Sequence, residues 1–199
     1  GGAVMNHLSQ AIVPFALAAD AKLTDGYAWH QAIWQAFPGR ADDARDFLFR
    51  VDRRKEGFRV LLLSAYAPEA TDVLAWQTKA VGPSFLTHDF YRFQLKANPT
   101  FRRKEDRRRL AIYDEARLMA WMERKAKASG FVIKPGTLTV SAPIDETCKK
   151  DGHIVKHVAV DFTGVLRVTD RSRFTTSFNT GIGSAKGFGF GLLMLQPLH

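Results

Sequence analysis

The chain has 199 residues, of which 46% are hydrophobic and 12% aromatic. This is enough apolar material for one large domain or two small ones, and it excludes a wholly disordered chain. Twenty-nine Lys and Arg against 20 Asp and Glu give a net charge of +9, which favours nucleic acid or an anionic membrane as partner. The longest apolar runs, Val60–Leu63 and Leu192–Leu195, are far shorter than the ~20 residues of a membrane span. The single Cys148 excludes an internal disulfide, as expected for the cytosol.

The first half of the chain predicts a β-α-β-β-(α)-β order, the split βαβ pattern. Thr24-Asp25 is a helix N-cap signal, and Pro38-Gly39 ends the helical stretch Gly26–Phe37. The segment Thr71–Leu86 is ambiguous and favours a short helix or an irregular connection. Four apolar or alternating runs predict strands, the middle two joined as a hairpin: Leu8–Leu17, Phe47–Asp52, Phe58–Ala65 and Phe90–Ala97.

The second half predicts a second unit of the same kind, (β)-α-β-β-α-β. Asn98–Arg109 is a polar, basic connector, and Asp114 and Asp170 are N-cap signals for two helices. The first of these runs to about Ser129 before Gly130, with an apolar stripe of Ala116, Leu118, Met119, Met122 and Ala126, and the second covers Arg171–Asn179. The predicted strands are Thr137–Ile144 and His153–Val168, joined by a turn at Lys150-Asp151-Gly152, and Leu192–Gln196. We therefore expect an α+β fold of two tandem ferredoxin-like domains, residues 5–97 and 98–199.

The first helix carries a histidine and a tyrosine one turn apart. The arc expected to face the core comprises Trp29, Ile33, Ala36 and Phe37, with Ala28, Gln31 and Gln35 opposite. Tyr27, His30 and Trp34 lie on the boundary between these faces. An imidazole, with its unperturbed pKa of about 6.5, and a phenol can share acid–base work on a phosphodiester: one takes the proton of a ribose 2′-hydroxyl and the other protonates the leaving 5′-oxygen. The alternative is a packing pair without chemistry.

A charge run follows in the connector. It comprises Arg102, Arg103, Lys104, Arg107, Arg108 and Arg109. From residue 102 to residue 127 there are ten basic side chains and five acidic ones, so this segment holds +5 of the total +9. Arginine is typical of sites where bidentate phosphate contacts matter. We interpret the run as a polyanion-binding surface, and the alternative is a solvated linker or helix face.

The third feature is Gly181–Gly191, with five glycines in eleven positions. Backbone so rich in glycine can approach a phosphate and donate N–H groups to it, and Lys186 adds charge. The residues that we single out for such contacts are Gly183, Ser184, Lys186, Gly187 and Gly189. Nucleotide-binding motifs are excluded, because the segment follows a helix and leaves no room for a βαβ unit. The alternative is a turn before the last strand.

The sequence predicts no metal site and no cofactor. Among the six histidines, only His153 and His157 are four residues apart. Both fall in a predicted strand, where that spacing separates them by about 13 Å, too far to share an ion.

Four separated motifs, which agree in order and spacing, resemble the CasE family, the repeat-RNA endoribonucleases of type I-E CRISPR (Cascade) systems. The resemblance covers about Met5 to Leu198. Its motifs are Tyr27–Pro38 (YAWHQAIWQAFP), Arg45–Arg50 (RDFLFR), Phe93–Pro99 (FQLKANP) and Gly181–Leu193 (GIGSAKGFGFGLL).

The resemblance implies two ferredoxin-like domains, binding of the hairpin of CRISPR repeat transcripts, and one metal-independent cut at the 3′ base of the stem. The 2′-hydroxyl attacks and leaves a 2′,3′-cyclic phosphate and a 5′-hydroxyl. The family's active-site histidine and tyrosine correspond to His30 and Tyr27, and its glycine-rich loop to Gly181–Gly191. We expect His30 to protonate the leaving oxygen, Tyr27 to position the ribose, and Lys186 or a nearby arginine to stabilise the transition state.

The resemblance also implies partners and a location. The product stays bound, so the partners are precursor and mature CRISPR RNA and the other Cascade subunits, in the cytoplasm and without a membrane. On charge we place Arg102–Arg109 in the family's basic groove. The alternative function is a structured-RNA-binding subunit without catalysis.

Overall fold

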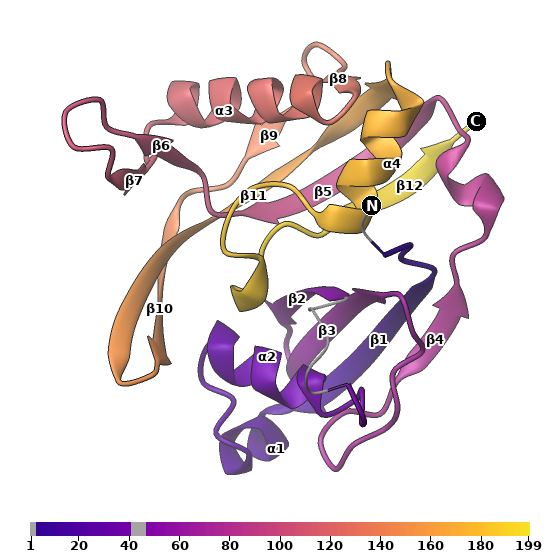
Figure 1. Ribbon diagram of the computed structural model, residues 1–199, viewed down its shortest axis with the longest axis vertical. Helices are drawn as coiled ribbons and strands as arrows, with labels where there is room; N and C mark the ends of the chain where they lie inside the picture. Colours follow the sequence, from indigo (N-terminus) through magenta and orange to yellow (C-terminus); the bar gives the residue numbers. More distant parts are fainter. Residues whose placement is uncertain (1–2, 41–46) are drawn as a thin grey trace.

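In the computed structural model, which describes residues 3–40 and 47–199, the chain forms two units of sheet and helix that lie one above the other (Figure 1). Residues 41–46 lie outside the described part of the chain, and Arg45 of the second motif is among them. Among the described residues, no helix is long and apolar enough to cross a membrane.

The first unit is a four-stranded antiparallel sheet with two helices. Its helices are α1 (Phe15–Asp20) and α2 (Gly26–Trp34). Its strands are β1 (His7–Pro14), β2 (Phe47–Arg53), β3 (Gly57–Ser64) and β4 (Gln77–Ala80), in the spatial order β2-β3-β1-β4. The hairpin predicted from the two middle runs is confirmed as β2 and β3. The first predicted strand is too long, because the ladder ends at Pro14, which has no N–H to donate, and α1 begins at the next residue.

Both faces of this first sheet are covered. On one face, Trp29 and Ile33 of α2 share a core with Phe49 and other strand residues. On the other face, Leu48 of β2 and Leu61 and Leu63 of β3 share a core with Phe178 and Leu192, which belong to the second half of the chain. Burial on both faces is why Val60–Leu63 is a continuous apolar run without alternation.

The second unit has a larger sheet with two helices, α3 (Glu115–Ala128) and α4 (Arg171–Thr180). Its main strands are β5 (Phe90–Ala97), β10 (Ile144–Lys150), β11 (His153–Val168) and β12 (Leu193–Leu198), in the order β10-β11-β5-β12, and the short strands β8 (Phe131–Ile133) and β9 (Thr139–Val140) also pair with β11. The core joins helices and sheet, since Trp121 of α3 stacks on Phe162 and Phe174 of α4 contacts Phe131.

The two units share one strand order. The first sheet has the spatial order β2-β3-β1-β4, so its strands lie side by side as the second, third, first and fourth along the chain. The second sheet contains the order β8-β11-β5-β12, and these four strands are likewise the second, third, first and fourth of their set along the chain. A β-α-β-β-α-β chain gives this arrangement in a split βαβ unit. The internal symmetry that the element order predicts is therefore present in the hydrogen-bonded pairing.

The pairing of β5 corrects the predicted boundary between residues 97 and 98. We expected Phe90–Ala97 to be the last strand of the first unit, but β5 pairs with β11 and β12. The fourth strand of the first sheet is β4, in the segment that the sequence left ambiguous, and the 3₁₀ helix η1 (Pro83–Leu86) follows it. The chain therefore changes sheets between Ala80 and Phe90. All four residues of β4 are exposed at the sheet edge, so no apolar pattern marks the strand.

The connector and the strand predicted after it also differ from expectation. Residues 98–109 are not a plain linker, since β6 (Thr100–Arg102) pairs with β7 (Arg109–Ala111) as a hairpin. The predicted strand Thr137–Ile144 is divided between β9 and the start of β10. The turn after β10 is confirmed, with φ of 50° at Asp151 and 78° at Gly152, as a type I′ hairpin turn requires.

The helix caps are confirmed. Asp114 and Asp170 accept hydrogen bonds from the backbone N–H groups of Arg117 and Arg173. The apolar stripe of α3 needs one change, because Trp121 is buried while Ala116 is exposed.

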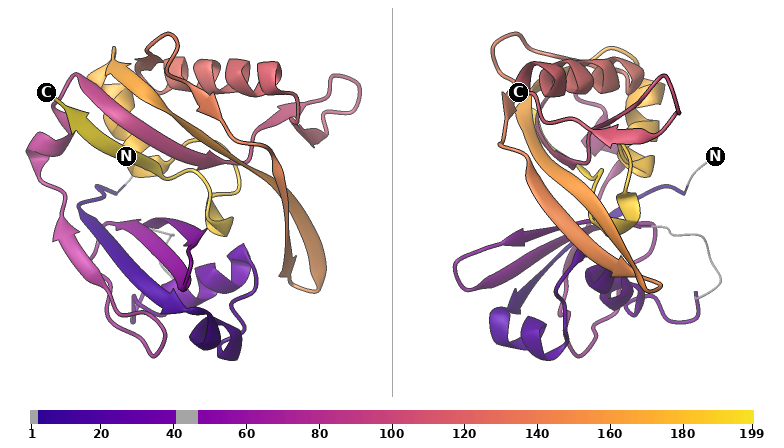
Figure 2. Two further views of the ribbon diagram at one scale, coloured as in Figure 1. Left: turned by 180° about the vertical axis from the view of Figure 1, so that it is seen from behind. Right: turned by 90° about the vertical axis from the view of Figure 1, so that its left-hand side faces the viewer.

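Two parts of the second unit reach the first. The β10–β11 hairpin extends beyond its sheet to the start of α2, as the two views of Figure 2 show. The glycine-rich segment contains the 3₁₀ helix η2 (Lys186–Phe188), which packs against α2 and β2.

Candidate active site

Helix α2 presents the candidate catalytic pair at the edge of its buried face. Asp25 caps the helix by accepting a hydrogen bond of 2.9 Å from the N–H of Ala28. The predicted placement of side chains on this helix is confirmed. The core arc, Trp29, Ile33, Ala36 and Phe37, is buried; Tyr27, His30 and Trp34 are half-buried; Gln31 and Gln35 are exposed. Ala28 is the exception on the predicted outer face, since it is half-buried and packs against the core.

The His30 ring lies in an aromatic setting and remains half-buried. Its centroid is 6.5 Å from that of Tyr27, with the two planes within 20° of parallel. On the core side, Phe47 lies 5.4 Å and Phe49 6.3 Å from the imidazole. The Tyr27 hydroxyl accepts a hydrogen bond of 2.7 Å from Nε2 of Gln31. The helix thus places an imidazole and a phenol side by side, neither of them sealed in the core.

The glycine-rich segment packs directly on this helix. A Cβ on Gly26 would lie 2.4 Å from the carbonyl oxygen of Phe188, and the Phe188 ring is 6.4 Å from Tyr27. Gly189, with φ of 95°, lies over the Phe49 ring, where a Cβ would be 3.2 Å away. Several of the glycines therefore have a packing role, because they let this loop approach α2 and β2 more closely than other residues allow.

The tip of β10 contributes a cation that the sequence analysis did not single out. The ammonium group of Lys150 lies 5.9 Å from the ring centroids of both Tyr27 and Phe188. Its only sequence signal is its position before the Asp151-Gly152 turn. This position predicts that Lys150 lies at the tip of a hairpin, but it does not predict which residues the tip contacts.

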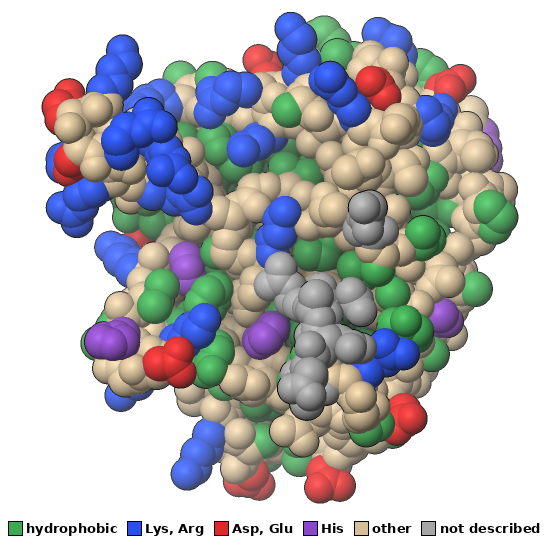
Figure 3. Space-filling view, in the orientation of Figure 1, with side chains coloured by type: hydrophobic (Ala, Val, Ile, Leu, Met, Phe, Trp, Pro, Cys, Tyr) green, Lys and Arg blue, Asp and Glu red, His purple; other side chains and the backbone are tan. Residues whose placement is uncertain are grey.

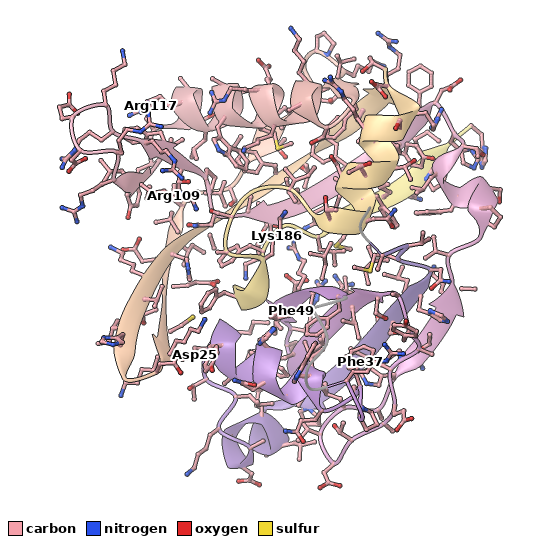
Figure 4. The ribbon with its side chains drawn as sticks, in the orientation of Figure 1. Asp25, Phe37, Phe49, Arg109, Arg117 and Lys186 are labelled. Atoms are coloured by element: carbon pink, nitrogen blue, oxygen red, sulfur yellow. The ribbon has the colours of Figure 1, made fainter. Side chains whose placement is uncertain are left out.

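A hollow of about 690 Å³ lies between the β6–β7 hairpin, β11 and the glycine-rich segment, and neither Tyr27 nor His30 lines it. Arg108, Arg109 and Lys156 supply positive charge to its lining, and Ser184 and Phe188 come from the glycine-rich segment. Phe188 therefore lines the hollow and also contacts Tyr27. Lys and Arg side chains gather over the β6–β7 hairpin at the upper left of Figure 3, and Figure 4 labels Arg109 and Lys186.

The other basic residues of the run lie near this hollow without lining it. Arg102, Lys104 and Arg107 are exposed on the same hairpin. Arg103 forms an ion pair with Asp106 inside the hairpin. Lys186 begins η2, and its Cγ packs near Gly191.

The remaining predicted glycines have differing surroundings. Gly183, with φ of 88°, lies over Trp121, where a Cβ would be 3.4 Å from the indole, while Gly187 lies within η2. Of the predicted contact residues, the structure thus brings Arg108, Arg109 and Ser184 to one concave surface.

The two strand histidines have different surroundings. His153 is exposed, whereas His157 is buried, with its ring 4.5 Å from Phe188 and 5.7 Å from Phe190. Burial lowers the pKa of His157, and the charge of Glu146 opposes this shift. Within residues 3–40 and 47–199, no cluster of three or more His, Cys, Asp or Glu could hold a metal ion.

Comparison with known proteins decides the family. A family model described as "CRISPR associated protein" matches residues 7–197. The "CRISPR system Cascade subunit CasE" of Escherichia coli (strain K12) is 34% identical, over 96% of this chain and 100% of the relative. This chain belongs to the CasE family of CRISPR-associated proteins.

Two further matches cover nearly the whole length of this CasE-family chain. The "CRISPR-associated endoribonuclease Cse3" of Thermus thermophilus is 27% identical, over 92% of this chain and 96% of the relative. A solved structure of "CRISPR endoribonuclease Cse3 bound to 19 nt RNA" superposes with a TM-score of 0.86 at 25% identity, covering 97% of this chain and 100% of that one. The predicted α+β fold of two ferredoxin-like domains is confirmed by this match and by the shared strand order.

Proposed function

We propose that this chain binds the hairpin of CRISPR repeat transcripts, cuts it once at the 3′ base of the stem without a metal ion, and remains bound to the product. As a member of the CasE family, the chain is a CRISPR RNA endonuclease and a subunit of Cascade. One observation supports the proposal that this chain cuts the repeat hairpin with the pair on α2. Phe188 lines the basic hollow and also contacts Tyr27, which is next to His30. RNA held in the hollow would therefore lie beside the pair on α2.

The chemistry that we assign to this pair is transesterification within the RNA. The ribose 2′-oxygen attacks the adjacent phosphorus, the bond from phosphorus to the 5′-oxygen breaks, and the ends are a 2′,3′-cyclic phosphate and a 5′-hydroxyl. His30 donates a proton to the leaving 5′-oxygen. Tyr27, whose hydroxyl is oriented by Gln31, hydrogen-bonds the attacking 2′-hydroxyl, and water takes up the proton that this hydroxyl loses. Lys186 and Lys150 supply positive charge for the developing phosphorane.

We propose that the stem lies across the β6–β7 hairpin and the hollow. All six basic residues of the run, Arg102, Arg103, Lys104, Arg107, Arg108 and Arg109, are exposed there. An RNA stem is recognised mainly through its shape and its backbone, which suits a surface rich in arginine. The segment Gly183–Gly189 forms the opposite wall and contributes Ser184 to it. We place the reaction in the cytoplasm, where the transcripts are made.

The experiment that tests this function is cleavage of repeat hairpin RNAs in the presence of EDTA, with both product ends analysed. The wild-type chain should yield one cut, a cyclic phosphate and a 5′-hydroxyl. His30→Ala should reduce the single-turnover rate at least 100-fold, at the low end of what acid–base catalysis contributes, while the Kd for the hairpin changes less than twofold.

A hairpin with a 2′-deoxy nucleotide at the cut position separates chemistry from binding. It should bind with the wild-type Kd and remain intact, because it lacks the attacking oxygen. Tight binding of the all-ribose hairpin without any product would identify a binding subunit. Cleavage of the 2′-deoxy hairpin, or a His30→Ala variant that cuts at the wild-type rate, would refute the assigned chemistry.

A further inference from the structure

The carboxylate of Asp25 hydrogen-bonds to both units of the protein at once. Its Oδ1 accepts a hydrogen bond of 2.9 Å from the N–H of Ala28, which caps α2. Its Oδ2 accepts a hydrogen bond of 3.0 Å from the N–H of Lys149, in β10 of the second unit. Figure 4 shows Asp25 at the start of α2, beside the β10–β11 hairpin. One side chain therefore starts the helix of Tyr27 and His30 and also binds the other half of the molecule.

The residues on either side of Lys149 also contact the start of α2. The Cys148 side chain is buried; its burial raises the pKa of the thiol, and the nearby backbone N–H groups of Tyr27 and Gly26 partly oppose the shift. Lys150 lies over the Tyr27 ring. Three successive residues of β10 thus contact the first turn of α2, one turn before His30.

We propose that Asp25 is a positioning residue for RNA cleavage. Its hydrogen bond to Lys149 fixes the position of Tyr27 and His30 relative to the RNA that the second unit binds. This inference rests on the proposed function, since residues of the second unit line the hollow and the catalytic helix belongs to the first unit. Removal of the bond affects the rate of the chemical step more than RNA affinity. A displacement of about 1 Å between reacting groups can reduce a rate about 100-fold.

Asp25→Asn separates the two roles of this carboxylate. The amide keeps one acceptor oxygen for Ala28 N–H, and asparagine is as good an N-cap as aspartate. The amide nitrogen is a donor, so it cannot accept the N–H of Lys149. We expect the single-turnover cleavage rate at saturating protein to fall at least tenfold. The Kd for the 2′-deoxy hairpin should change less than twofold.

The chain offers a matched control in Asp114→Asn. Asp114 caps α3 in the same way, through the N–H of Arg117, and among the described residues no backbone N–H of the first unit donates to it. This variant should cut at the wild-type rate. Equal reductions of rate in the two variants would show that a change of helix cap alone accounts for the effect.

Lys149→Pro removes the same bond from the other side. Because the N–H of Lys149 points to Asp25, it takes no part in the pairing of β10 with β11. Strand β10 is at the edge of its sheet, where proline is tolerated. We expect Lys149→Pro to slow cleavage as Asp25→Asn does, and the double variant to be no slower than either single one.

The outcomes separate the inference from the proposed function. If the wild type cuts and Asp25→Asn cuts at the same rate, or if the rate reductions of the two single variants multiply in the double variant, the positioning role is refuted while the proposed function stands. If Asp25→Asn weakens binding of the 2′-deoxy hairpin as much as it slows cleavage, Asp25 is a binding residue and the inference is wrong. A wild-type chain that cuts no repeat hairpin overturns the proposed function and, with it, the inference.

Discussion

The carbonyl oxygen of Phe188 lies so close to Gly26 that a Cβ on this glycine would be 2.4 Å from it. These residues are 162 positions apart in the chain, and their contact joins η2 to the first turn of α2. No flexible side chain separates the two backbones at this point, so any larger residue must push them apart.

Gly26→Ala should therefore reduce both cleavage and stability. The added methyl group moves η2 away from α2, which separates the hollow from Tyr27 and His30. We expect the cleavage rate to fall by about 100-fold and the free energy of unfolding to fall by about 1–3 kcal/mol. Single-turnover kinetics and urea unfolding measure the two effects.

Gly82→Ala is the control for this substitution. Gly82 has φ of −69°, and apart from Gly82 and its two chain neighbours no described residue has a heavy atom within 4 Å of a Cβ built there. That variant should cut normally and be as stable as the wild type or slightly more stable. Normal cleavage by Gly26→Ala would mean that the contact with Phe188 does not matter to the reaction.

The double variant Arg108→Ala/Arg109→Ala should weaken hairpin binding and reduce its dependence on salt. Both side chains line the hollow. If each arginine binds one phosphate, the slope of log K against log salt concentration becomes less steep by about 0.7–0.9 for each arginine removed. Filter binding at several salt concentrations measures this slope.

A matched pair of exposed lysines in the first unit provides the comparison. Lys55→Ala/Lys79→Ala removes the same net charge from the β2–β3 turn and from β4, and it should leave the slope unchanged. Equal changes of slope in the two double variants would indicate general electrostatic attraction rather than phosphate binding in the hollow.

The sequence predicted local features of this protein well, because each depends on a few adjacent residues. Asp25, Asp114 and Asp170 all cap helices through their side chains. The Asp151-Gly152 turn has the positive φ angles expected of its residue types. The two faces of α2 also follow directly from helical periodicity.

Features that depend on distant parts of the chain could not be predicted. β5 has the alternation of a strand, but nothing in Phe90–Ala97 indicates whether it pairs with β1 or with β11. β4 carries no apolar pattern, because it is fully exposed at an edge. The positions of Lys150 beside Tyr27 and of Lys149 against Asp25 result from packing between the units. The sequence thus predicted the pair on α2 but not the contact of β10 with the start of that helix.

Arg50→Met should destabilise the protein strongly. The Arg50 side chain is 4% exposed, and it donates to Asp52 within β2 and lies 2.6 Å from Asp161 of β11. Burial alone would raise the pKa of Asp52, but the hydrogen bonds and charge of Arg50 hold this pKa below its usual value. Without the guanidinium, Asp161 loses its partner and Asp52 keeps only Arg59. Because the Asp161 side chain is 38% exposed, we expect the free energy of unfolding to fall by about 1–3 kcal/mol. Urea unfolding at pH 7 measures this decrease in stability.

Arg103→Met serves as the exposed counterpart, since the pair of Arg103 with Asp106 lies at the surface. We expect no measurable change in its unfolding curve. If Arg50→Met unfolded at the wild-type urea concentration, the ion pairs between β2 and β11 would contribute nothing to joining the two units.

The stability of the protein should fall as the pH decreases below about 6.5, partly because of His157. Burial against Phe188 and Phe190 lowers the pKa of this imidazole in the folded state, so the unfolded chain binds its proton more readily. The stabilisation is complete above the pKa of the unfolded chain, about 6.5, and is lost progressively as the pH falls toward the folded-state value. His157→Phe keeps an aromatic ring against η2 and removes the titrating group, so its Tm should fall less between pH 7.5 and pH 5 than that of the wild type. Thermal unfolding across this range measures the difference, with His153→Gln, an exposed position on the same strand, expected to keep the wild-type dependence. Parallel curves for the wild type and His157→Phe would show that protonation of this imidazole does not oppose folding.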